Sequence, residues 1–273
     1  MSTDNVTYRD ISTISGGTLG DIKPEQRDGA LRGAEILAKS LTLEGVDTVF
    51  GYPGGANLEI FDVLRDFGIR CVRVEHEQGA AHAAQGYARA SGKVGVCLAT
   101  SGPGATNLVT GIADANSDSI PIVAITGNVP SQLLGKNAFQ EVDIVSIVQP
   151  ITKRAYLVDR VGRIPAAVKL AFSHAGGNRP GPVLIDIPKD IQQHYPRDPD
   201  GNYVEPRMPA VVEMPEETPG GMHEDQLQEC RRLIAEAKRP VIYAGGGIVA
   251  AGAESVLLAF AERIDAPLTT TIM

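Results

Sequence analysis

Glu77 is the side chain that the sequence places best for acid–base chemistry. It follows the apolar run Cys71–Val74 and precedes an Ala-rich helical segment, so it falls where a strand passes into a helix. Open parallel α/β sheets bind ligands outside the carboxyl ends of their strands, and a carboxylate there can hold or move a ligand proton. The alternative is a solvated loop carboxylate. His76 does not indicate zinc, because the next histidine, His82, is six residues on and not four as in HExxH.

Two glycine-rich turns can present backbone N–H groups to a ligand. Gly102–Gly104 leads into a predicted helix, where free N–H groups can face anionic or polar atoms; a tight turn without a ligand is the alternative. Gly245–Gly247 together with Ala250 fits G-x-G-x-x-A. Asp265 precedes the next predicted strand and does not end it, which disfavours NAD and leaves open a flavin or a nucleotide diphosphate.

Lys189 follows the apolar run Val183–Ile187 through a proline. A lysine just past a parallel strand can steer an anionic substrate, and a solvated surface lysine is the alternative. The amide-rich segment around Phe139 and Gln140 has no role that its residue types alone establish.

Composition excludes several classes of function. The 273 residues carry a net charge of −8, which argues against a surface for nucleic acid, since phosphate backbones are held by clustered Lys and Arg. No apolar stretch reaches the roughly 18 residues of a membrane span, and the N-terminus lacks the pattern of a signal peptide. Three cysteines without a CxxC predict a reducing compartment, and we expect a cytoplasmic protein.

The elements that position these residues alternate along the chain between strand and helix. Short apolar runs predict strands over 46–50, 71–74, 94–99, 120–126 and 183–187. Helical periodicity predicts helices over 30–44, 58–67, 80–90, 106–115 and 165–175. Such alternation predicts an α/β fold built on a parallel sheet.

The domain organisation predicted from the sequence has four parts. Residues 1–28 form a polar arm, 29–194 form the α/β domain, and 195–224 form a linker that holds six of the eighteen prolines. A second α/β unit over 225–273 contains predicted helices over 226–237 and 254–264 and predicted strands over 241–244 and 267–271. About 49 residues are too few to close a domain of ordinary size, so we expect an incomplete one.

Several runs of residues, in their order along the chain, resemble the catalytic large subunit of acetohydroxyacid synthase (acetolactate synthase), a family of thiamine-diphosphate enzymes. The resemblance extends from Ala30 to Asp190 and resumes over Arg239–Met273. The matching runs are Phe50–Ala56, Glu75–Ala84, Gly86–Ala90, Thr100–Asn107, Ala138–Glu141, Arg179–Val183 and Ile187–Asp190. The resemblance implies a parallel-sheet, pyrimidine-binding domain followed by the start of the family's middle domain.

The resemblance also implies roles for individual residues. Glu77 would bond the pyrimidine N1′ of thiamine diphosphate, and Gln140 would line the active site. Further cofactor positions carried over are Tyr52, Pro53, Gly54, Gly55, Ser101, Gly102 and Asn107. Phe139 and Lys189 would lie near the substrate entrance, and Arg179, Gly245 and Gly246 match positions that hold FAD.

The activity implied by the resemblance is decarboxylation of pyruvate and its ligation to a second 2-oxo acid, pyruvate or 2-oxobutyrate. The products, 2-acetolactate and 2-aceto-2-hydroxybutyrate, lead to branched-chain amino acids. The family is homodimeric or tetrameric, often with a small regulatory subunit, and holds Mg²⁺ through a C-terminal G-D-G…N motif that this sequence lacks. We therefore expect a truncated form that is inactive alone. The alternatives are another thiamine-diphosphate carboligase or decarboxylase of 2-oxo acids, and a non-catalytic cofactor-binding fragment. Glu77 disfavours glyoxylate carboligase, which has an apolar residue there.

Overall fold

The computed structural model describes residues 29–209 and 223–271. The chain divides into two compact units, Met1–Met214 and Pro215–Met273. The predicted arm over 1–28 and residues 210–222 of the predicted linker lie outside the described residues.

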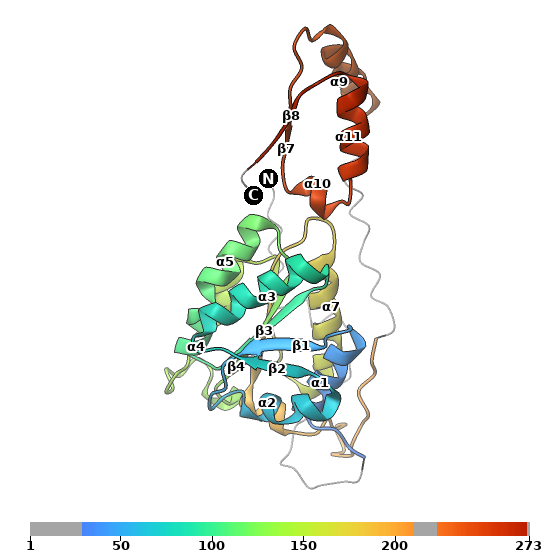
Figure 1. Ribbon diagram of the computed structural model, residues 1–273. Coiled ribbons are helices and arrows are strands. Elements are labelled where there is room, and N and C mark those ends of the chain that lie inside the picture. The colour runs from blue at the N-terminus through green and yellow to red at the C-terminus, as the bar shows by residue number, and fades with distance from the viewer. Residues whose placement is uncertain (1–28, 210–222, 272–273) are drawn as a thin grey trace. The chain divides into compact units, whose positions relative to one another are not determined.

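The first unit is built on a six-stranded sheet in the order β2-β1-β3-β4-β6-β5. Figure 1 labels the strands β1 to β4 of this sheet. Every neighbouring pair of strands in this sheet is parallel, as the alternation of strands and helices predicts. The strands are β1 (Thr48–Gly51), β2 (Arg70–Arg73), β3 (Gly95–Ala99), β4 (Ile122–Asn128), β5 (Arg154–Leu157) and β6 (Val183–Pro188).

Helices cover both faces of this sheet, which explains why β3, β4 and β6 are buried along their whole length. On one face α1 (Gly33–Leu43), α2 (Leu58–Leu64) and α7 (Ile164–Gly176) enclose a core that includes Val96 and Leu98. On the other face α3 (Glu77–Ser91), α4 (Pro103–Asn107), α5 (Val109–Asp118) and α6 (Ile144–Val148) enclose Cys97 and Ala99. The side chains of successive residues in β3 therefore point alternately into two separate cores.

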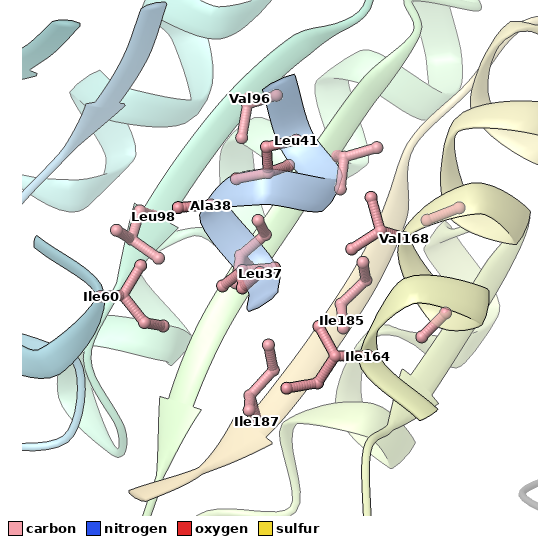
Figure 2. Close-up of a cluster of buried hydrophobic side chains, with 14 of the residues drawn as sticks. Leu37, Ala38, Leu41, Ile60, Val96, Leu98, Ile164, Val168, Ile185 and Ile187 are labelled. Atoms are coloured by element: carbon pink, nitrogen blue, oxygen red, sulfur yellow. The ribbon is translucent and has the colours of Figure 1, made fainter. Parts of the chain in front are cut away.

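Figure 2 shows the first of these cores at close range. Leu37 and Leu41 of α1 lie in the same cluster as Val96 of β3, Val168 of α7 and Ile185 of β6. The cluster joins a helix near the start of the unit to the strand near its end, so the core ties together distant parts of the sequence.

Three short elements of the first unit were not predicted. Strand β5 is an edge strand whose four residues, Arg154–Leu157, form no continuous apolar run. The helices α6 and α8 (Lys189–Gln193) have five residues each, too few to show helical periodicity. The predicted helix over 106–115 is in fact two helices, α4 and α5, which meet at Leu108. Short 3₁₀ turns complete the unit at Arg65–Phe67, Ser131–Leu133, Gln149–Ile151 and Val161–Arg163.

Residues 195–209, within the predicted linker, contact the first unit. The backbone N–H of Leu31 donates to the Tyr203 hydroxyl, and the Ser40 hydroxyl donates to the sulfur of Met208. These contacts join the end of the described first unit to α1 and the residues before it.

The second unit contains α9 (Glu224–Glu236), β7 (Ile242–Ala244), α10 (Gly247–Ala250), α11 (Glu254–Arg263) and β8 (Leu268–Thr270). Its sheet has the two parallel strands β7 and β8. Several large apolar side chains of the unit are exposed, among them Tyr243, Val256, Leu258 and Phe260. No helix in the described parts of either unit is long and apolar enough to span a membrane.

Candidate functional site

The carboxyl ends of β1 and β3 form a switch point of the sheet. Strand β1 lies between β2 and β3, so the chain leaves β1 toward one side and continues from β3 toward the other. The turn after β1 leads to α2 on one face, and the turn after β3 leads to α4 on the opposite face. Open α/β sheets bind their ligands at such points.

Glu77 lies at this edge, in the first turn of α3 and not in a loop before the helix. The helix begins three residues earlier than predicted because His76 caps it: the His76 Nδ1 accepts a hydrogen bond of 3.1 Å from the Gln78 N–H. The sequence therefore located the residue correctly and misplaced the start of its helix.

The Glu77 carboxylate is buried, with 9% of the residue exposed, and has one oxygen in use. Its Oε2 accepts a hydrogen bond of 2.9 Å from the Asn107 side-chain amide at the end of α4. Within the described residues Oε1 accepts none, and it lies next to Gly104, where a methyl group would approach it to 3.1 Å. A ligand N–H group could donate a hydrogen bond to Oε1, so that both oxygens of this carboxylate would then be bonded.

Two turns lie at this edge of the sheet, one after β1 and one after β3. In the first, Asn57 is fully buried and its side chain holds the turn by accepting from the Gly54 N–H at 2.7 Å. In the second, Ser101 is buried and Gly102 adopts φ +58°, a conformation that favours glycine. The predicted cofactor positions Tyr52, Pro53, Gly54, Gly55, Ser101, Gly102 and Asn107 thus lie on these two turns and on α4.

Gln140 lies against the second turn. A methyl group at Gly102 would come within 2.7 Å of the Gln140 carbonyl oxygen, so only glycine permits this approach. Gln140 itself has a φ of +58°. Glu141 stabilises the segment because its carboxylate accepts from the Ala138 N–H at 2.9 Å and from the Gly135 N–H, and these bonds lower its pKa. Phe139 is 88% exposed beside it.

Lys189 is the first residue of α8 and follows β6 directly, so it lies at the same edge of the sheet two strands beyond β3. It is half-buried, and no carboxylate among the described residues forms an ion pair with it. This position is compatible with an approach to a ligand at the switch point.

Asp186 is a buried acid that the sequence reasoning missed. Its two oxygens accept bonds of 2.6 Å from the Thr126 hydroxyl and the Asn128 amide, both on the neighbouring strand β4. Burial raises the pKa of this carboxyl group to about 7 in spite of these two donors. The signal was an aspartate inside the apolar run Val183–Ile187.

The structure does not bring Arg179 to this edge. Arg179 precedes β6, at the amino end of the strands, and its Nε donates to the Ser119 hydroxyl at 2.7 Å. Gly245 and Gly246 belong to the second unit, where they connect β7 to α10. The three predicted FAD positions therefore lie apart from Glu77 in the fold or in a separate unit.

The described residues contain no group of three His, Cys, Asp or Glu side chains that could hold a metal ion. The site they form is a buried carboxylate between two glycine-containing turns, suited to bind a polar ring by hydrogen bonds.

Comparison with known proteins defines the class. Residues 31–147 match the N-terminal TPP binding domain of thiamine pyrophosphate enzymes, and residues 227–273 match the central domain of the same enzymes. Strands β1 to β4 and the switch point thus belong to the cofactor-binding domain of a thiamine pyrophosphate enzyme, as the resemblance predicted.

Within this class the relatives identify the family. The chain is 48% identical over 250 residues to a probable acetolactate synthase large subunit of Methanocaldococcus jannaschii, covering 89% of this chain and 40% of the relative. It is 50% identical over 245 residues to the acetolactate synthase large subunit of Corynebacterium glutamicum, covering 89% of this chain and 38% of the relative. It is 48% identical over 248 residues to the chloroplastic acetolactate synthase of Arabidopsis thaliana, covering 90% of this chain and 36% of the relative. The chain belongs to the acetolactate synthase large-subunit family and spans about two fifths of the length of these curated relatives.

Proposed function

We propose that this chain is the pyrimidine-binding part of a thiamine-diphosphate-dependent acetolactate synthase. The observation that carries the proposal is the Glu77 carboxylate, which is buried at the switch point with one oxygen bonded to Asn107 and the other available. The identities of 48% and 50% to acetolactate synthase large subunits support the choice of reaction within the class.

The residues at the switch point fit the aminopyrimidine end of thiamine diphosphate. Oε1 of Glu77 has room for a ring nitrogen because position 104 is a glycine, and Gly55 faces open space, with no atom where its Cβ would point. When bound, the cofactor would supply an electron sink for the decarboxylation of a 2-oxo acid. Glu77 would share a proton with the ring nitrogen, and its buried position would limit the exchange of that proton with water.

The other site residues bind and orient. We propose that the turn Tyr52–Gly55 and the turn around Ser101 and Gly102 line the pyrimidine, with Asn107 fixing the Glu77 carboxylate. Gln140, held against Gly102, would contact the substrate, and Phe139 and Lys189 would lie at its entrance. The substrates proposed are pyruvate as donor and pyruvate or 2-oxobutyrate as acceptor, giving the precursors of branched-chain amino acids.

Further cofactors and partners remain proposals. We propose Mg²⁺ as a further cofactor, held outside residues 29–209 and 223–271, as the resemblance to the family implies. FAD is proposed for Arg179, Gly245 and Gly246. We propose a homodimer or tetramer, with a small regulatory subunit, as the working assembly. We propose a cytoplasmic location because Cys71, Cys97 and Cys230 are unpaired.

The test is Glu77→Gln in the enzyme that contains this chain. The amide fills the site and cannot share the proton, so deuterium exchange at the thiazolium carbon should slow by about 10²–10⁴-fold, the usual size of a general acid–base contribution. The matched control is Glu75→Gln, a largely exposed carboxylate two residues away that pairs with Arg73. Exchange in Glu77→Gln that equals exchange in Glu75→Gln would contradict the assignment.

A further inference from the structure

We propose that Thr100 is a positioning residue that sets the spacing between the two turns of the site. It is the first residue after β3, is 9% exposed, and its side chain contacts both turns. The inference rests on the proposed function, because the spacing matters only if a ligand occupies the space beside Glu77.

The Thr100 hydroxyl fixes the turn after β1. Its Oγ1 accepts a buried hydrogen bond of 3.1 Å from the Ala56 N–H. The Ala56 carbonyl is held from another element, because it accepts from the Gln192 side-chain amide at 2.7 Å. It also lies so close to Gly127 that a methyl group at 127 would approach its oxygen to 2.0 Å. With both groups of its peptide backbone bonded, Ala56 has little freedom to move, and Thr100 supplies the contact from β3.

The Thr100 methyl group fills the space between the turns. A methyl group at Gly54 would lie 2.6 Å from Cγ2 of Thr100, and one at Gly104 would lie 2.7 Å from the same atom. The two glycines therefore approach one methyl group, which separates the turn after β1 from the turn after β3. Gly104 is in turn the neighbour of Glu77 Oε1, so a shift of this turn changes the surroundings of the carboxylate.

The two halves of this side chain can be removed separately. Thr100→Val keeps the methyl contacts and leaves the buried Ala56 N–H without its acceptor, whereas Thr100→Ser keeps the acceptor and loses the methyl group. Ile164→Val is the matched control for a loss of stability alone, because Ile164 is buried in the core of Figure 2, away from both turns.

The first measurement uses this chain without cofactor. Amide hydrogen exchange followed by mass spectrometry should show faster exchange over 52–57 in Thr100→Val, by tenfold or more, and no change over 164–176. Thr100→Ser should exchange like the wild type over 52–57, because the hydroxyl is retained. Unchanged exchange over 52–57 in Thr100→Val would overturn the role of the hydroxyl whether or not the cofactor assignment holds.

The second measurement uses the enzyme that contains this chain. Thr100→Val should raise the thiamine diphosphate concentration at half-maximal rate tenfold or more, and Ile164→Val should stay within about threefold. Thr100→Ser, which loses the methyl group between the turns, should raise this concentration by less than Thr100→Val and by more than Ile164→Val. Equal values for Thr100→Val and Ile164→Val would show that Thr100 is structural only and would overturn the proposal. A wild type that needs no thiamine diphosphate would instead refute the proposed function, and would overturn the cofactor half of this inference with it.

Discussion

At the scale of the residue, Asp186 joins β4 to β6 through a carboxyl group whose pKa burial raises to about 7. A raised pKa in the folded state means that the folded chain holds the proton more tightly than the unfolded chain. This contribution to stability is fully present below about pH 4, the range in which an unfolded aspartate titrates, and is lost as the pH rises through about 7.

Asp186→Asn should remove this dependence, since an amide mimics the protonated acid. We expect urea unfolding of the variant to give a free energy of unfolding that changes less between pH 4 and pH 8 than that of the wild type. Asp47→Asn is a control in which the pH dependence of stability should change in the opposite direction, because the hydrogen bond from Lys93 lowers the Asp47 pKa to about 2. If the free energy of unfolding of Asp186→Asn changed with pH as much as that of the wild type, the raised pKa of Asp186 would be contradicted.

Lys189, at the start of α8, carries a second prediction. Lys189→Met should raise the apparent KM for pyruvate about 3- to 10-fold more than it lowers kcat, because it removes electrostatic steering of an anion. The difference should shrink as salt increases. Lys93→Met is the matched control, since it removes the same charge from a lysine paired with Asp47 before β3, at the opposite edge. Equal KM values for the two variants at low salt would make Lys189 a surface lysine.

At the scale of the element, α3 and α5 approach each other at Gly111. A methyl group there would lie 2.4 Å from the Ala81 Cβ, so Gly111→Ala should force the helices apart and cost about 1–3 kcal/mol of stability. Gly86→Ala is the matched control, because Gly86 is exposed on α3 with open space around it, and should gain about 0.5–1 kcal/mol. Thermal unfolding of both variants checks the pair; a stable Gly111→Ala would contradict the close approach.

The elements that the sequence predicted are those with enough residues to show a period. Strand β4 is buried throughout because both of its faces are covered and begins with the apolar run Ile122–Ile125, and α7 shows helical periodicity over thirteen residues. Strand β5 was missed because an edge strand needs no continuous apolar run. The order β2-β1-β3-β4-β6-β5 depends on pairings between distant segments, which local patterns do not contain.

The candidate site was predictable where chemistry follows the end of a strand, as for Glu77 and Gly102. The contacts that support it were not predictable, since Thr100 and Asp186 act through neighbours 44 and 60 residues away in the sequence. Gln140 could be assigned only by resemblance, because its place against Gly102 depends on a loop held by Glu141.

At the scale of the whole molecule, the chain covers 36–40% of the length of the curated relatives compared above. We propose that its described residues bind one end of the cofactor; among them, no group of three His, Cys, Asp or Glu side chains could hold a metal ion at the other end. Without a clamp on the diphosphate, the positioning of the reactive carbon is lost. We therefore expect residues 1–273 alone, supplied with thiamine diphosphate, Mg²⁺, FAD and pyruvate, to form no acetolactate. Sustained formation by a preparation free of other enzymes would contradict this.

The burial of β3 has a consequence for the chemistry of sulfur. Cys97, in the middle of that strand, is fully enclosed, and burial raises the pKa of its thiol to about 12, whereas Cys71 and Cys230 are exposed. Because the thiolate is the reactive form, an alkylating reagent reaches Cys97 only when the centre of the sheet opens. The rate at which Cys97 is alkylated therefore measures how often the first unit opens, whereas Cys71 and Cys230 react without such opening.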